Sequence, residues 1–114
     1  MWGVDIFMSD LIAQMVQVIV KEVNPEQIVL FGSRSAGKDS VESDVDLLII
    51  ETSSFDQGRS RRHEMTRLWR ALGRFPVAKD ILVYSREEVE RWSKSLNHVV
   101  ARALREGRTV YERP

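Results

Sequence analysis

Acidic residues occur at two places in this sequence where they could hold a metal ion. Asp44 and Asp46 begin one apolar run, and Asp80 lies inside a second. Residues two apart in a strand face the same side, ~6.6 Å apart along the chain, so both carboxylates can reach one cation. Mg²⁺ prefers such oxygen ligands together with phosphate oxygens and water. The pattern predicts metal-dependent phosphate chemistry at Asp44 and Asp46, joined by Asp80 if its strand lies alongside.

A Gly-Ser pair, Gly32 and Ser33, directly follows another apolar run at residues 27–31. Glycine lets the backbone approach a ligand closely, and a helical turn starting there would point free N–H groups at a phosphate. Arg34 is next in the chain and is a candidate contact for a triphosphate. These residues therefore predict a phosphate-binding loop.

Each feature also has a simpler explanation. Gly32-Ser33 fits an ordinary strand-to-helix turn, and the aspartate pair fits a solvated strand entrance. Asp80 could instead pair with Lys79 or a nearby arginine at the sheet edge. Two observations count against these alternatives: the strand after Asp46 is apolar on both faces, where an unpaired charge is costly, and aspartate is disfavoured within strands.

The elements that must position these residues follow from apolar periodicity and turn signals. In the strand that contains Asp46, alternate residues are expected to face opposite sides. Ser85 and Glu88 predict a capping box. Helices are expected at about 10–23, 59–73, 86–96 and 98–105, and strands at 27–31, 44–50, 77–84 and 108–111.

The 114 residues fit one domain, residues 1–114, of the α/β (α+β) class. We expect a mixed sheet of three or more strands flanked by helices. Core packing is expected for Trp69, on the inward face of the second helix, and for Trp2, Phe7 and Trp92.

Composition excludes several function classes. The 17 basic and 17 acidic residues balance, so net charge favours neither nucleic acid nor membrane as a partner. The absence of cysteine excludes disulfides, thiolate metal sites and cysteine nucleophiles, and fits the cytoplasm. The N-terminal apolar stretch lacks signal-peptide features and is too polar to span a bilayer. Residues 56–79 hold seven basic residues against two acidic ones. We interpret them as a solvated helix face, the alternative being attraction of a triphosphate or an acidic partner.

Taken together, these residues resemble the minimal nucleotidyltransferases of the DNA polymerase β-like superfamily. That family's pattern is Gly-Ser, ten residues, then Asp-x-Asp, and here Gly32-Ser33 and residues 34–43 precede Asp44-Val45-Asp46. The residues from Phe31 to Gly37 and from Ser43 to Leu48 also resemble the corresponding sequences of that family. Asp80 matches the third acidic residue that the family carries on a later strand.

The resemblance implies a palm-like nucleotidyltransferase fold that uses a nucleoside triphosphate. Gly32 and Ser33 would hold the β- and γ-phosphates. Asp44 and Asp46 would bind Mg²⁺, with two ions expected, and Asp80 would complete the metal and catalytic set by positioning or deprotonating the attacking hydroxyl.

Small stand-alone members of this family resemble antitoxins whose partner is an all-helical HEPN ribonuclease toxin. By that resemblance, the chain is expected to transfer AMP from ATP to a protein hydroxyl, a tyrosine of its cognate HEPN toxin. Two alternatives stay open: a non-catalytic binding module of the same fold that neutralises the toxin by complex formation, and a transferase for a small acceptor. Neither membrane nor direct nucleic-acid binding is expected, and a homo-oligomer is left open.

Overall fold

The computed structural model describes residues 10–32, 44–56 and 58–114. Its strands form one mixed sheet in the order β3-β2-β1-β4, so the predicted fold class is confirmed. None of the described helices has the length and apolar character needed to cross a bilayer. The helices are α1 (Asp10–Val23), α2 (Arg61–Ala71), α3 (Arg86–Trp92) and α4 (Val99–Glu106), and the strands are β1 (Gln27–Phe31), β2 (Val45–Glu51), β3 (Lys79–Ser85) and β4 (Arg108–Glu112).

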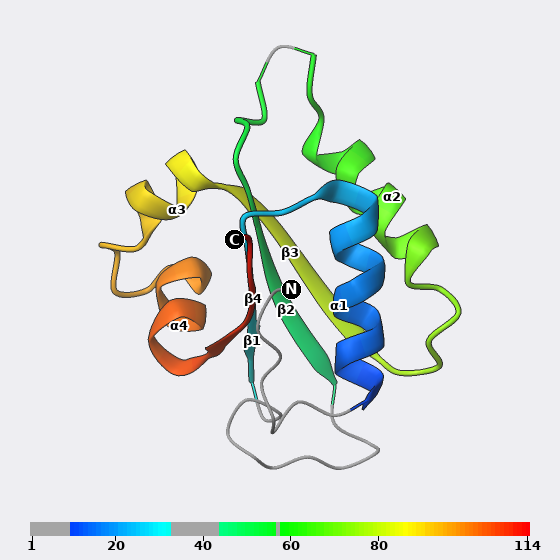
Figure 1. Cartoon of the computed structure of the whole chain (residues 1–114). Helices are drawn as coiled ribbons and strands as arrows, with labels where there is room; N and C mark the ends of the chain where they lie inside the picture. The colour runs from blue at the N-terminus through cyan, green and yellow to red at the C-terminus, as the bar shows by residue number, and fades with distance from the viewer. Residues whose placement is uncertain (1–9, 33–43, 57) are drawn as a thin grey trace.

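Strand β2 lies between β1 and β3 and sets the register of the sheet. It pairs antiparallel with β1, with Asp46 opposite Phe31, and parallel with β3, with Asp46 opposite Asp80. Strand β4 pairs antiparallel with the other side of β1. The end of β1 and the starts of β2 and β3 therefore lie at the same end of the sheet, as Figure 1 shows.

Both faces of the sheet are covered by helices. Helices α1 and α2 lie on one side, and α3 and α4 lie on the other (Figure 1). Val45, Leu47 and Ile49 of β2 pack in the core on the α1–α2 side, whereas Leu48 and Ile50 pack on the α3–α4 side. The predicted alternation of β2 is confirmed, and burial on both faces explains why the strand is apolar throughout.

Local sequence sets most of the helix ends. The side chain of Ser60 accepts a hydrogen bond from the His63 N–H at 3.3 Å, so α2 begins at residue 61, two residues later than predicted. Ser85 and Glu88 form the predicted capping box at the start of α3. Helix α1 ends before Asn24, whose φ of 46° leaves the right-handed helical region ahead of a proline.

Trp69 lies at the surface, so its predicted place in the core is wrong. Its exposed fraction is 40%, because Leu68 and Leu72 occupy the inward line of α2. Trp69 instead flanks the helix, where Nζ of Lys79 lies 5.6 Å from the centre of a ring.

Trp92 is also largely exposed, at 37%, and the core prediction for it is wrong too. Its helix, α3, ends at this residue rather than continuing to about Leu96. The indole stacks on the His98 ring with centroids 4.5 Å apart, which gives it a packing partner outside the core. Trp2 and Phe7 lie outside the described residues.

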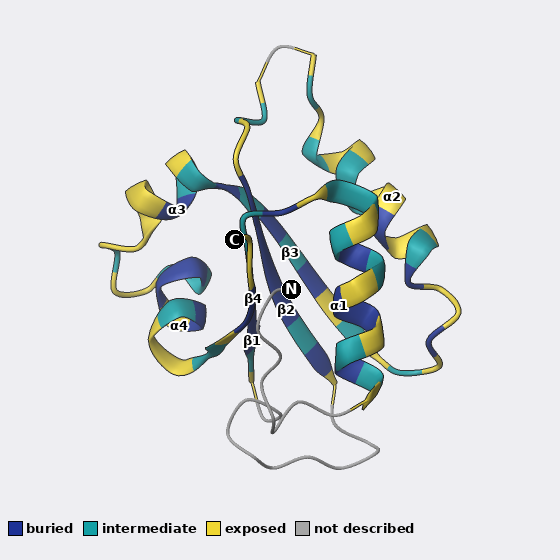
Figure 2. Cartoon of the chain, in the orientation of Figure 1, coloured by how far each residue is buried: buried dark blue, intermediate teal, exposed yellow. Residues whose placement is uncertain are grey.

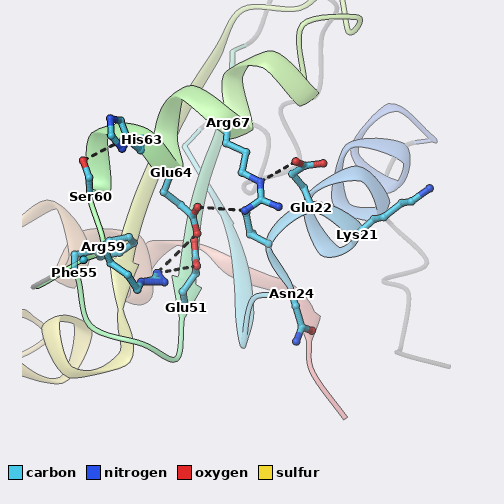
Figure 3. A pocket seen from close by; sticks show the side chains of 12 residues that line it. Lys21, Glu22, Asn24, Glu51, Phe55, Arg59, Ser60, His63, Glu64 and Arg67 are labelled. Carbon is cyan, nitrogen blue, oxygen red and sulfur yellow. Dashed lines mark hydrogen bonds and ion pairs between the residues drawn. The ribbon is translucent and has the colours of Figure 1, made fainter.

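A charged network joins both helices of the α1–α2 layer to the last residue of β2 (Figure 3). Glu51 is only 5% exposed, and Arg59 Nη2 donates to its Oε1 at 3.1 Å. The same Nη2 lies 3.8 Å from Glu64 of α2. Arg67 of α2 donates to Glu22 of α1 at 2.8 Å. The network therefore fastens α2 to the sheet and to α1.

One carboxyl of this network, that of Glu51, binds its proton more tightly than an exposed glutamate does. Burial, reinforced by the hydrogen bond and charge of Glu64, raises the pKa of Glu51 to about 8 despite the opposing charge of Arg59. Its Oε2 is buried and has no N–H donor among the described residues. In Figure 3 the Glu64 carboxyl faces this group, and its negative charge favours a proton on Glu51. Because this pKa lies above the ordinary 4.5, the associated stability is complete below that pH and is lost as the pH rises through about 8.

Glu51→Gln keeps this position neutral at every pH. We expect the free energy of unfolding of the variant to exceed that of the unaltered protein at about pH 9, by on the order of 1 kcal/mol or more. The difference should shrink toward about pH 5, where Glu51 of the unaltered protein holds its proton. Urea unfolding, followed by circular dichroism between about pH 5 and pH 9, measures this difference in the free energy of unfolding. The exposed Glu90→Gln is the control. If Glu51→Gln leaves the pH dependence unchanged, Glu51 is ionised in the folded protein.

Candidate active site

The three aspartates predicted to do chemistry lie at one end of the sheet. Asp44 directly precedes β2, Asp46 is the second residue of β2, and Asp80 is the second residue of β3. Asp46 and Asp80 are register partners on adjacent parallel strands. Asp44 and Asp80 are exposed and Asp46 is half-buried. Asp80 was expected to join the other two aspartates if its strand lay beside that of Asp46, and the two strands are adjacent.

These carboxylates repel one another. Burial raises the pKa of Asp46, and the negative charges of Asp80 and then Asp44 raise it further. Lys79 does not offset Asp80, because its Nζ donates to the carbonyl oxygens of Phe75 at 3.0 Å and Val77 at 3.2 Å. Within residues 10–32, 44–56 and 58–114, none of the three aspartates forms an ion pair with lysine or arginine. The described part of the chain thus leaves this acidic group uncompensated.

Because Gly32 has no side chain, the Asp46 carboxylate can lie against the backbone there. Gly32 follows the last residue of β1 and has a φ of 78°, a conformation that side chains strongly disfavour. A Cβ atom at this position would overlap Oδ2 of Asp46. The glycine is therefore required by the carboxylate as well as by the turn. Ser33, Arg34 and the helical turn predicted after them lie outside the described residues.

The donor set suits a hard divalent cation. Asp44, Asp46 and Asp80 offer carboxylate oxygens, the ligands that Mg²⁺ prefers, and their mutual repulsion falls when a cation lies among them. In the parts of the chain that the structure describes, no three acidic or histidine side chains are already gathered around one point. The fit therefore rests on the shared end of the sheet, the donor chemistry and the uncompensated charge.

Comparison with known proteins identifies the fold to which this site belongs. The family described as "Polymerase beta, Nucleotidyltransferase" matches residues 13–114. This chain belongs to that family. The matched region of the nucleotidyltransferase domain contains all four strands and the three aspartates. The family predicted from the Gly-Ser and Asp-x-Asp spacing is confirmed, whereas the roles of the individual residues stay predictions.

One solved structure with a similar fold is described as "Crystal structure of the toxin-antitoxin with AMP-PNP". The two chains superpose with a TM-score of 0.52 and are 19% identical, over 88% of this nucleotidyltransferase and 73% of that chain. At this identity, the likeness concerns the fold. No curated protein sequence gives a significant match to the chain.

Sequence reasoning missed one feature beside the site, the exposed indole of Trp69. A signal for it was present, because Trp69 lies on the same helical stripe as Arg62 and Thr66, both polar. Its contact with Lys79 brings it to the residue that precedes Asp80. An aromatic surface therefore adjoins the acidic end of the sheet.

Replacing Gly32 by alanine tests the contact with Asp46. Gly58 provides a matched control, because its φ of 83° carries the same backbone cost while a Cβ there would meet nothing within 4 Å. We expect Gly58→Ala to lower the free energy of unfolding by roughly 1 kcal/mol and Gly32→Ala by roughly 2–3 kcal/mol, as the carboxylate is displaced. Urea unfolding at neutral pH measures both. Equal losses would mean that Asp46 does not lie against Gly32.

Proposed function

We propose that this chain transfers AMP from ATP to a protein hydroxyl and acts as an antitoxin, with a tyrosine of a HEPN-type toxin as the acceptor. The observation that carries the proposal is the common position of Asp44, Asp46 and Asp80 beside Gly32 in a polymerase β-type nucleotidyltransferase domain. The antitoxin role is supported by the chain's resemblance to stand-alone antitoxins of this family. It is also supported by the similarity in fold to a toxin–antitoxin structure containing AMP-PNP.

The residues have distinct tasks in this reaction. Asp44, Asp46 and Asp80 would hold Mg²⁺, expected as two ions, which neutralises charge on the triphosphate and on the departing pyrophosphate. Gly32 leaves the backbone open to the β- and γ-phosphates, and Ser33 and Arg34 follow it in the chain.

The transfer itself is a displacement at the α-phosphorus. The hydroxyl oxygen of the acceptor forms a bond to this phosphorus while the bond to the bridging oxygen breaks, and pyrophosphate leaves with the electron pair. The exposed carboxylate of Asp80 takes the hydroxyl proton. Asp46 is held by Gly32 on one side and lies opposite Asp80 on the other, which keeps the acidic residues in register.

An acceptor that docks from outside fits the architecture. All four described helices are used to cover the sheet, α1 and α2 on one face and α3 and α4 on the other. A large acceptor would therefore bind on the outer surface. This favours a protein over a small molecule enclosed by a second lobe of the described fold.

Removing the carboxylates tests the chemistry. We expect the protein, incubated with labelled ATP, Mg²⁺ and the HEPN-type toxin proposed as its partner, to add one AMP to that toxin, detected by mass spectrometry. Asp44→Asn with Asp46→Asn should lower the transfer rate by about 100-fold or more, because the charge that holds the cation is lost. Asp56→Asn, in an exposed loop, is the matched control and should transfer at the unaltered rate.

The same variants separate catalysis from occlusion. If the double variant relieves toxicity in cells as well as the unaltered protein does, AMP transfer is not the mechanism, and the chain is a non-catalytic module that acts by complex formation. Calorimetric titration with Mg²⁺ and ATP checks the metal assignment independently. Equal heats for the double variant and the unaltered protein would show that Asp44 and Asp46 are not ligands.

A further inference from the structure

Two arginines on the outer face of α2 are free of ion-pair partners within the described ranges. They are Arg62 and Arg70, both exposed. The other basic residues of this stretch are engaged. Arg59 contacts Glu51, Arg61 contacts Glu88, Arg67 contacts Glu22, Arg74 lies over the Phe75 ring, and Lys79 binds two backbone carbonyls. The basic stretch that was predicted to be a solvated face therefore holds several residues engaged in contacts and two exposed arginines, Arg62 and Arg70, that form no ion pair within the described ranges.

The uncommitted arginines belong to a continuous surface. Arg62, Thr66 and Arg70 are spaced four residues apart, and Trp69 adjoins them, so all four share one side of the helix. We name these four residues the α2 face. The two arginines are separated by ~12 Å along the helix axis. In Figure 2, most of α2 is coloured as exposed or intermediate.

A groove between α2 and α1 borders this face at Thr66 and Arg70. Its volume is about 650 Å³, and Thr66 and Arg70 line it together with Glu22 of α1 and Arg67. The Glu22 carboxylate is already neutralised by Arg67 at 2.8 Å. The charge that the groove presents to a ligand is therefore set mainly by Arg70.

The α2 face leads to the acidic end of the sheet. Helix α2 is followed by residues 72–78 and then by β3, whose start lies at the same end as that of β2 (Figure 1). Trp69 contacts Lys79, with Nζ 5.6 Å from the ring centre, and Lys79 precedes Asp80. Lys79 and Asp80 are consecutive in β3, so their side chains point to opposite faces, and Asp80 shares the α3–α4 face with Leu82. Because β3 is an edge strand of the sheet, a molecule that lay along the α2 face would reach Asp80 around that edge.

The residue types indicate a protein ligand with acidic side chains. Tryptophan and arginine are the residues that most often dominate binding energy at protein interfaces. Nucleic acid is less well suited, because tracking its phosphates needs a broad basic surface. The chain has 17 acidic residues for its 17 basic ones, Glu64 belongs to the same helix, and Glu22 of α1 borders it. Exposed arginines with no partner here favour carboxylates that are supplied from outside.

We propose that the α2 face docks an acidic segment of the protein that receives AMP, so that the acceptor hydroxyl reaches Asp80, on the other face of the sheet, around the edge formed by β3. The identity of the docked protein as the acceptor rests on the proposed function. Docking itself needs neither ATP nor metal, because none of the three aspartates belongs to the face.

Charge reversal tests the docking directly. The probe is a fluorescein-labelled peptide of alternating Glu and Ala, with a single-stranded oligouridylate of equal charge as competitor, measured by fluorescence anisotropy without ATP or Mg²⁺. We expect Arg62→Glu with Arg70→Glu to weaken peptide binding by about tenfold or more. The matched control is Arg91→Glu with Arg102→Glu, which reverses two exposed arginines on the opposite layer and should leave binding unchanged.

A second pair of variants tests the aromatic part. Trp69 and Trp92 are exposed to similar extents, 40% and 37%, on opposite layers of the molecule. Trp69→Ala should weaken peptide binding several-fold, whereas Trp92→Ala should not. Circular dichroism confirms that each variant is folded.

Three outcomes would overturn the proposal. The unaltered protein could fail to bind the peptide, or the two double arginine variants could bind it equally well. The third is that the unaltered protein binds the oligouridylate more tightly than the peptide and that reversing Arg62 and Arg70 abolishes this binding. The transfer assay keeps this result apart from the proposed function. With the whole acceptor protein, the same reversals should raise KM and leave kcat unchanged. Loss of peptide binding with unchanged KM would exclude the α2 face as the acceptor site while leaving the chemistry intact.

Discussion

The pairing of β2 with both of its neighbours fixes where every acidic residue of the site lies. Asp46 can face Asp80 only because β2 and β3 are parallel and in this register, and it can lie against Gly32 only because β1 ends beside the start of β2. A slip of one residue would turn Asp46 to the other face and exchange the side chains of the two cores. The apolar residues of β2 make that slip costly, since both of its faces are buried. The strand that carries Asp46 is thus held in place by a core on both of its faces.

Much of this arrangement could be predicted from the sequence, because it depends on local chemistry. The capping box of Ser85 and Glu88 uses residues three apart, and the alternation of β2 is a property of any strand. The spacing from Gly32 to Asp46 in the sequence is enough to indicate the family. Asp80 was a strand aspartate that propensity disfavours, which made it visible as a candidate.

Other features depend on elements that are distant in the chain, and the sequence did not predict them. Trp69 was predicted to face inward together with Leu68 and Leu72, yet these two leucines fill the space above the sheet and leave the indole at the surface. The surroundings of Glu51 arise because Arg59 from a loop and Glu64 from a helix converge on the end of a strand. No period or motif encodes such a meeting, because it is set by how the helices pack on the sheet.

The two ends of β2 deal with acidic charge in different ways, and the difference bears on function. At one end, Glu51 is buried, Arg59 lies at 3.1 Å, and burial and Glu64 raise the pKa of Glu51, so a cation and a favoured protonated form both limit the negative charge there. At the other end, Asp46 has two acidic neighbours and no basic partner among the described residues. Leaving acidic residues together costs stability, and such a cost persists where function requires it. The contrast supports a site whose positive charge arrives with its ligands.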